Sequence, residues 1–153
     1  MKKSTNEVAT AAGANSGIEL GKSKNKTLHD FYRNYIAAAN ARDFASIANV
    51  VAENVTLNGA AVKREDIIAE FKGLVNAVPD FTWHIEDLVV EEDRIAARLR
   101  DTGTPEATTF FGQNSNRKSV TFTEFGSYKV RDGLFVEMSY LIDVPSISQQ
   151  LKK

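Results

Sequence analysis

The chain has 153 residues, of which 42% are hydrophobic and 25% charged, and its formal net charge is −1. This length and composition suit one globular domain that is large enough for a core or an internal cavity. The near-neutral charge gives no cationic footprint, which argues against nucleic acid and anionic membranes as partners. The absence of cysteine excludes disulfides and thiolate catalysis, and two histidines are too few for a histidine-rich metal cage, so no metal site is predicted.

The first 26 residues are rich in small and polar side chains and contain no aromatic residue. Such a segment cannot bury enough surface to offset the entropy of ordering it, so residues 1–26 are predicted to be a flexible tail. The segment lacks the apolar stretch of a secretory signal, and no run of apolar residues approaches the roughly 18 needed to cross a bilayer. We therefore expect a cytoplasmic protein with one domain over residues 27–153.

Three helices are predicted in the first half of the domain. Apolar and aromatic residues recur at helical spacing after Thr27, which predicts a helix over residues 27–42. Asp43 opens a second, short helix, and a short strand follows and ends at Asn58-Gly59. A third amphipathic helix begins at Arg64 and ends before Pro79.

The second half of the chain has the pattern of an antiparallel sheet. Residues 81–90 and 94–102 are predicted to form one hairpin, and two long strands between Ser119 and Pro145 form another around Asp132-Gly133. A polar loop joins the hairpins, and a short helix or coil ends the chain. Helices followed by strands indicate an α+β fold: a cone-shaped, strongly bent sheet that holds the three N-terminal helices in its concavity and encloses a pocket.

Two carboxylates are the candidate catalytic groups. Asp143 closes an apolar strand, so it is either solvated at a rim or active in a pocket. If Asp132-Gly133 is a two-residue turn, Leu141 pairs with Glu124, and Glu124 becomes a diagonal neighbour of Asp143 on one face. Neighbouring carboxylates in an apolar pocket raise one another's pKa, as general acid–base catalysis near neutral pH requires. The alternative is that both bind backbone amides or an arginine at the rim.

Five further residues are candidates for substrate binding, and each has a purely structural alternative. The same turn logic places Arg98 opposite Asp87, so Arg98 either holds a substrate carboxylate or enolate, or forms a cross-strand pair. Trp83 is either a pocket wall or core, and Asn58 either orients a carbonyl or makes the turn. Tyr32 and Tyr35 offer hydroxyls to a cavity or belong to an aromatic core.

The last strand also predicts an association surface. Met138, Tyr140 and Ile142 alternate with Ser139, Leu141 and Asp143, so the first set is outward if Asp143 is inward. Exposed apolar strips usually mark association. We therefore expect a homodimer through the outer face of the sheet, with Met138 and Tyr140 buried between subunits.

Four sequence segments resemble the SnoaL-like polyketide cyclase family, which includes many predicted ester cyclases and lies within the nuclear transport factor 2-like superfamily. The segments are Asn40-Ala41-Arg42-Asp43, Pro79-Asp80-Phe81-Thr82-Trp83, Arg98 through Gly103-Thr104-Pro105, and Asp132-Gly133 through Glu137 to Asp143. The resemblance extends over about residues 27–151. It implies a cone-shaped α+β fold, commonly homodimeric, with a deep pocket for a small-molecule ligand.

The resemblance also implies an activity. Cyclases of this family close a ring by intramolecular aldol chemistry without metal or cofactor, using a pocket carboxylate as general acid and base. In this chain the role would fall to Asp143, assisted by Glu124, and the substrate would be a small, largely apolar carbonyl compound. The alternative is a non-catalytic ligand-binding or dimerisation module, because the same fold serves both purposes.

Overall fold

The structure is a computed structural model that describes residues 26–152. The predicted tail lies outside the described residues apart from Lys26, which is helical. The N-terminal helix spans residues 26–40, and α2 (Phe44–Asn49) follows the Asp43 cap, whose Oδ1 accepts a hydrogen bond from the Ser46 amide at 3.1 Å. The remaining helices are α3 (Arg64–Ala77) and α4 (Val144–Leu151). These positions agree with the helices predicted from periodicity.

Six strands form one sheet in the order β2-β1-β8-β7-β4-β3. The strands of this sheet are β1 (Val51–Leu57), β2 (Ala60–Lys63), β3 (Thr82–Glu91), β4 (Arg94–Gly103), β7 (Val120–Arg131) and β8 (Leu134–Ile142). Neighbouring strands are antiparallel except for β1 and β8, which are parallel. The sequence did not predict β2, nor the small hairpin of β5 (Thr109–Phe110) and β6 (Gln113–Asn114) within the polar loop.

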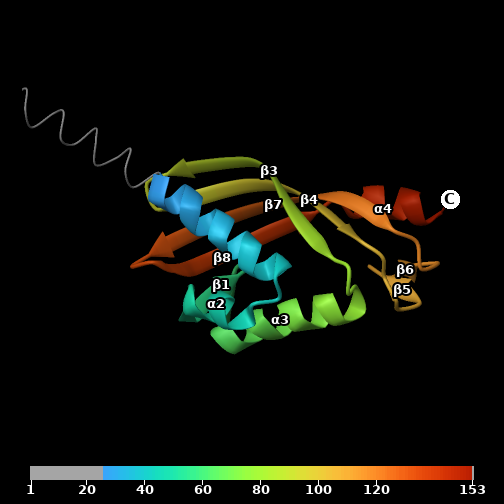
Figure 1. Ribbon diagram of the computed structural model, residues 1–153, viewed down its shortest axis with the longest axis horizontal. Helices are drawn as coiled ribbons and strands as arrows, with labels where there is room; N and C mark the ends of the chain where they lie inside the picture. The colour runs from blue at the N-terminus through green and yellow to red at the C-terminus, as the bar shows by residue number, and fades with distance from the viewer. Residues whose placement is uncertain (1–25, 153) are drawn as a thin grey trace, which may run out of the picture.

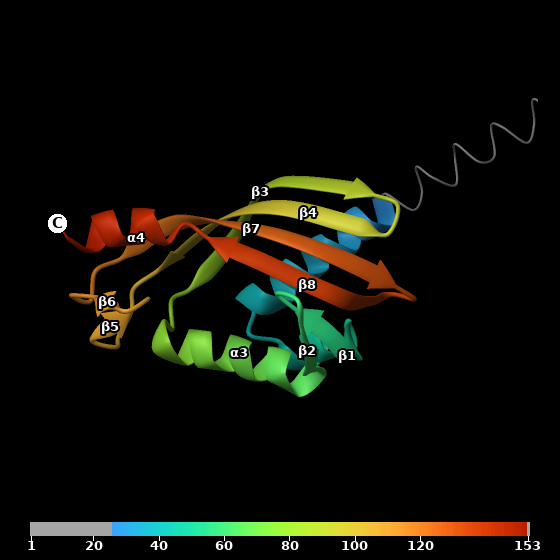
Figure 2. The ribbon, with the colours of Figure 1, turned by 180° about the vertical axis from the view of Figure 1, so that it is seen from behind.

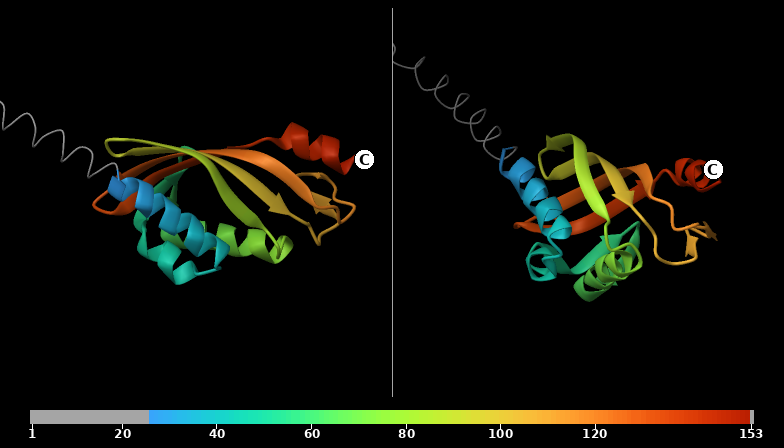
Figure 3. Two further views of the ribbon diagram at one scale, coloured as in Figure 1. Left: turned by 45° about the horizontal axis from the view of Figure 1, so that its top comes forward. Right: turned by 45° about the vertical axis from the view of Figure 1, so that its right-hand side comes forward.

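The sheet is strongly curved, and the N-terminal helix, α2 and α3 lie on its concave side (Figure 1). Figure 3 shows the sheet arching over these helices, with α4 extending beyond its end. Seen from behind, β3, β4, β7 and β8 present their convex face, and none of the described helices lies across the middle of it (Figure 2). The predicted α+β fold with a bent sheet around N-terminal helices is confirmed.

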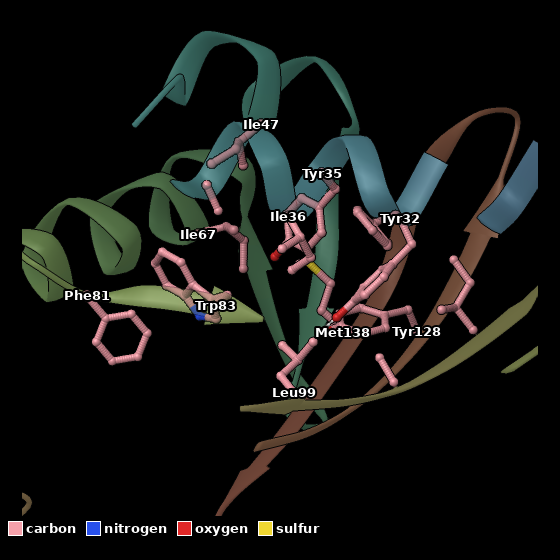
Figure 4. Close-up of a cluster of buried hydrophobic side chains, with 14 of the residues drawn as sticks. Tyr32, Tyr35, Ile36, Ile47, Ile67, Phe81, Trp83, Leu99, Tyr128 and Met138 are labelled. Carbon is pink, nitrogen blue, oxygen red and sulfur yellow. Dashed lines mark hydrogen bonds between the residues drawn. The ribbon is translucent and has the colours of Figure 1, made fainter. Parts of the chain in front are cut away.

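Aromatic side chains fill the space between the N-terminal helix and the sheet (Figure 4). Tyr32 and Tyr35 project from the helix toward Tyr128 on β7, and the ring centroids of Tyr32 and Tyr128 are 5.2 Å apart. The Phe135 ring of β8 lies 4.8 Å from that of Tyr35. Tilted and edge-on ring pairs at such distances stabilise a core beyond the area they bury, so this cluster holds the helix on the sheet.

The hairpin between β7 and β8 contains an irregularity that decides which side chains face inward. The turn at Asp132-Gly133 pairs Arg131 with Leu134, as the sequence predicted. Beyond it the register shifts by one residue because β8 carries an extra residue, Val136, between the partners of β7. This is a β-bulge, and a one-residue shift turns every later side chain to the opposite face.

The bulge makes the predicted faces of β8 wrong. Glu124 lies opposite Ile142 instead of Leu141, so Ile142, Tyr140 and Met138 face the concave side. Met138 is core, and Leu141 points outward with 72% of its surface exposed. The outer apolar strip of β8 is therefore not the one built on Met138 and Tyr140.

Candidate functional site

A cavity of about 310 Å³ lies between the concave face of the sheet and the helices that cover it. Its walls come from the N-terminal helix, α3, β1, β3, β7 and β8, with Phe111 from the small hairpin. Eight of the lining residues are aromatic: Tyr35, Phe71, Phe81, Trp83, Phe111, Phe122, Tyr128 and Tyr140. Glu70 and Glu124 are the charged residues of the described lining. The cavity is thus apolar, with a few polar groups that can orient a ligand.

The end of the N-terminal helix positions one wall of this cavity. The Asn40 side chain brackets the backbone of Trp83, because its Nδ2 donates to the Trp83 carbonyl and its Oδ1 accepts from the Trp83 amide, both at 2.9 Å. Arg42 donates to the carbonyls of Pro79 and Phe81, each at 2.8 Å, and its guanidinium lies 5.8 Å from the centroid of the Trp83 ring. These bonds hold the start of β3 against the helix, which fixes the Trp83 ring in the cavity wall.

Glu124 is the acid that the sheet presents to the cavity. It lies on β7, opposite Leu99 of β4 and Ile142 of β8. Its carboxyl is surrounded by apolar and aromatic side chains, and this burial raises the pKa of Glu124 to about 7. A carboxyl with such a pKa can take up and release a proton near neutral pH.

Asp101 is a second buried acid next to Glu124, and the sequence analysis missed it. It lies on β4 opposite Phe122, two residues from the Leu99 that faces Glu124, so the two acids are diagonal neighbours on the concave face. Asp101 has 0% exposure, and within residues 26–152 neither of its carboxyl oxygens has a hydrogen-bond partner. Burial, and then the charge of Glu124, raise the pKa of Asp101 to about 9. The two carboxyls therefore titrate as a linked pair, with Asp101 holding its proton at neutral pH.

The alternation of β4 contains the signal that could have identified Asp101. Ile95, Ala97 and Leu99 are buried, and their neighbours are exposed. Asp101 continues this inward series at the same spacing of two. A carboxylate at a core position of a regular strand is a stronger indication of function than one at a strand end, such as Asp143, because it cannot turn into solvent.

Three tyrosines complete the polar part of the site. The Tyr32 hydroxyl donates a hydrogen bond to the Tyr128 hydroxyl across 3.3 Å. Tyr35 and Tyr128 line the cavity, and Tyr32 lies behind them with no exposed surface. Burial is the main cause that raises the pKa of each of the three phenols, with a smaller contribution from the charge of Glu124. All three hydroxyls therefore remain protonated and can donate hydrogen bonds.

The structure does not place Asp143 in the cavity, which corrects its predicted position. Asp143 follows the end of β8, is exposed, and caps α4 by accepting a hydrogen bond from the Ser146 amide at 3.1 Å. The prediction failed because the bulge at Val136 shifts the register of β8, and because the strand ends before Asp143.

Arg98 and Asn58 also lie outside the cavity lining. Arg98 is exposed on the convex face, opposite Asp87 as the turn logic predicted. Asn58 forms the turn after β1, where its Oδ1 accepts from the Tyr140 amide at 2.8 Å and ties β1 to β8. For both residues the structural alternative holds, a cross-strand position for Arg98 and a turn for Asn58, and neither is placed where a substrate-binding side chain was predicted.

Of the remaining candidates, Trp83 and Tyr35 line the cavity, and Tyr32 supports it from behind. The lining also includes Gly73, in the middle of α3. Gly73 is exposed at the edge of the cavity, and an added Cβ there would meet no atom within 4 Å.

The comparisons with known proteins agree with this geometry. The family model of SnoaL-like polyketide cyclases matches residues 29–151, and the chain belongs to this family. The family indicates a cyclase or isomerase that binds a small ligand. The comparison with curated proteins gives no match.

Solved structures of the same kind cover most of the chain. A SnoaL-like polyketide cyclase from Agrobacterium tumefaciens is 27% identical, with a TM-score of 0.77 over 81% of this chain and 97% of its own. A putative polyketide cyclase from Bacillus cereus is 26% identical, with a TM-score of 0.63 over 80% and 78%. IdmH from Streptomyces antibioticus, at 22% identity and a TM-score of 0.72 over 82% and 98%, shares the fold.

No helix in the described part of the chain is long and apolar enough to cross a bilayer. Across residues 26–152, carboxylates and imidazoles do not gather in threes as metal ligands would.

Proposed function

We propose that the protein is a cofactor-free cyclase or isomerase acting on a small, largely apolar carbonyl compound, with Glu124 as the residue that moves the proton. The observation that carries this proposal is a buried carboxyl with a pKa raised to about 7 by its apolar surroundings, at the wall of an aromatic cavity. Glu124 thereby takes the role that the sequence analysis gave first to Asp143.

The chemistry balances without any other reactant. Ionised Glu124 takes a proton from a carbon next to the ligand carbonyl, and the electron pair of that C–H bond moves to the carbonyl oxygen as an enolate. In a cyclase the enolate carbon then attacks a second carbonyl of the same molecule, forming a C–C bond and an alkoxide. Glu124 returns its proton to the alkoxide, so the enzyme ends in its starting state.

Asp101 serves this cycle as a positioning residue. Because it holds its own proton at neutral pH, it adds no full negative charge beside Glu124. If Asp101 ionised first, repulsion would drive the pKa of Glu124 far above neutrality and stop it from acting as a base.

The charge of the cavity limits the ligand. The described lining contains two carboxylates and no lysine, arginine or histidine. An anionic ligand would meet Glu124 without a compensating cation, so we expect the substrate to be neutral. Its rings would stack on aromatic walls such as Trp83.

The activity can be tested with a generic ketone before the substrate is known. The probe is 2-acetylnaphthalene in D₂O, and NMR follows exchange of its methyl protons for deuterium. Glu124→Gln keeps the side-chain volume but cannot accept a proton, so the catalysed exchange should fall by roughly 10²–10⁴-fold. Asp143→Asn is the matched control and should retain the rate.

The result also separates the enzyme from the alternative of a non-catalytic binding module. A module would bind the ketone, as titration calorimetry would show, without accelerating its exchange. Equal exchange in the wild type and Glu124→Gln would reject Glu124 as the base.

We also propose that two copies associate through the convex face of the sheet. Val89, Phe125 and Leu141 are exposed there at 59%, 56% and 72%, and they border a shallow groove. An apolar centre with charged residues around it has the make-up of a protein interface. The cytoplasmic location stays a prediction from the sequence.

A further inference from the structure

Tyr128 lies along its own strand because residue 126 is glycine. Glu124, Gly126 and Tyr128 occupy successive inward positions of β7, opposite Leu99, Ala97 and Ile95 of β4. This register places the three residues on one face of the sheet. A Cβ added to Gly126 would lie 2.6 Å from Cε2 and 2.8 Å from Cζ of Tyr128, closer than real Cβ atoms come. The Tyr128 ring therefore lies across Gly126 and extends toward Glu124.

The hydroxyl of this side chain lies over Gly126, at the inward position next to Glu124, because an added Cβ at residue 126 would meet the Tyr128 oxygen before any other atom. Two residues of an antiparallel strand advance by about 6.8 Å, roughly the distance from the Cβ of a tyrosine to its hydroxyl. Tyr128 is a lining residue of the cavity, as is Glu124. A larger residue at position 126 would push the ring away from this direction.

A hydrogen bond with Tyr32 orients the Tyr128 hydroxyl for donation to a ligand. The Tyr32 hydroxyl, which is fully buried, donates to the Tyr128 oxygen at 3.3 Å. A phenol oxygen that accepts a hydrogen bond keeps its own proton available. Among the described residues, no side chain or backbone group accepts a hydrogen bond from Tyr128. With Tyr32 as the donor in this pair, Tyr128 can give its own proton to a ligand, and the hydrogen bond between the two hydroxyls holds the Tyr128 oxygen in place.

We propose that Tyr128, backed by Tyr32 and given room by Gly126, donates the hydrogen bond that binds the carbonyl oxygen of the ligand and stabilises the charge that develops on it. The inference deepens the proposed function and rests on it only in that the ligand is a carbonyl compound. When Glu124 removes a proton from the neighbouring carbon, the electron pair moves to this oxygen, and a donor fixed in advance in an apolar site stabilises it strongly.

The groups around Glu124 and Tyr128 are consistent with donation. From the N-terminal helix they are Tyr32 and Tyr35, from β4 Asp101, from β8 Tyr140, and from α3 Glu70. None of these is a cation that could neutralise an enolate. Burial raises the pKa of Tyr128, so its phenol shares its proton with the oxyanion and does not lose it.

The experiment compares two ligands that differ in the carbonyl alone. Calorimetry measures the affinities of 2-acetylnaphthalene and 2-ethylnaphthalene for the wild type and for Tyr128→Phe, which removes one oxygen and preserves the ring. Loss of one hydrogen bond should weaken the affinity for the ketone by roughly tenfold. The affinity for 2-ethylnaphthalene should stay within about twofold of the wild-type value. Infrared spectroscopy of the bound ketone should show the C=O stretch moving to higher frequency in the variant.

Two further variants make the test specific. Ser127→Ala removes a hydroxyl from the exposed, opposite face of the same strand and should change neither the ketone affinity nor the C=O stretch. Gly126→Ala should reproduce the loss seen in Tyr128→Phe, provided that its melting curve shows a folded protein.

Several outcomes would overturn the inference. One is a wild type that does not prefer the ketone, and another is a Tyr128→Phe variant with an unchanged C=O stretch. A third is equal weakening of both ligands in that variant, which would mean that the hydroxyl only supports packing. These readouts do not depend on proton transfer by Glu124, so the exchange experiment and this one can fail separately.

Discussion

At the scale of single residues, Asp101 makes folding sensitive to pH. An unfolded chain ionises an aspartate near pH 4, but burial and Glu124 hold the folded-state pKa of Asp101 at about 9. The folded protein therefore binds more protons than the unfolded chain between these values. Stability from the neutral carboxyl is fully present below about pH 4 and is lost as the pH rises through the folded-state pKa. The raised pKa of Glu124 also lowers the stability of the folded protein as the pH rises, over the narrower range that ends at about pH 7.

Asp101→Asn should remove much of this dependence, because an amide of nearly the same volume cannot ionise. From pH 5 to pH 8 we expect the wild type to lose on the order of 4 kcal/mol of stability relative to the variant, because each pH unit between the two pKa values contributes about 1.4 kcal/mol. Thermal melts followed by circular dichroism from pH 5 to 9 measure the difference. Asp87→Asn, on the exposed convex face, is the control, and parallel curves for Asp101→Asn and the wild type would contradict the argument.

At the scale of elements, β8 explains how far the sequence could predict the site. Turn chemistry at Asp132-Gly133 predicted the hairpin and its first pair correctly, because a two-residue turn fixes local geometry. The bulge at Val136 has no comparable signature, since an extra valine in a strand looks like any other β-branched residue. Every assignment beyond it was inverted, including Tyr140, Leu141 and Asp143. Glu124 lies on the uninterrupted strand, and its predicted inward position survived.

Asp143 should behave as a helix cap and not as a cavity residue. Asp143→Ala removes the hydrogen bond to the first turn of α4, and we expect a loss of about 1 kcal/mol in urea denaturation. Asp143→Ser should keep most of the stability, because serine caps helices about as well. Binding of 2-acetylnaphthalene should be unchanged in both variants. A large loss of binding with intact stability would return Asp143 to the site.

At the scale of the whole molecule, the two faces of the sheet differ in shape and in the side chains that they carry. Its concave face holds the cavity, and its convex face carries exposed apolar side chains on β3, β7 and β8. Ion pairs flank that centre, with Arg94 and Glu137 at 3.5 Å and Arg100 and Glu86 at 3.5 Å. The sequence predicted the fold class because helices and strands have different periods, but the composition of each face depends on long-range register.

Leu141→Glu should convert the proposed dimer to a monomer, because it places a charge at the most exposed apolar position of the convex face. Light scattering at micromolar concentration measures the mass, with Ala60→Glu on the exposed β2 strand as control. We expect the cavity to bind 2-acetylnaphthalene in the monomer as well. A monomeric wild type would refute the proposed association.

The glycine in the middle of α3 has a consequence for redesign of the protein. Gly73 weakens its helix by about 1 kcal/mol relative to alanine, and it is an exposed residue at the edge of the cavity, with no atom within 4 Å of an added Cβ. One added methyl would therefore strengthen the helix without displacing any neighbouring atom. Alanine at this position is thus a route to greater thermal stability that requires no repacking of the residues around the cavity.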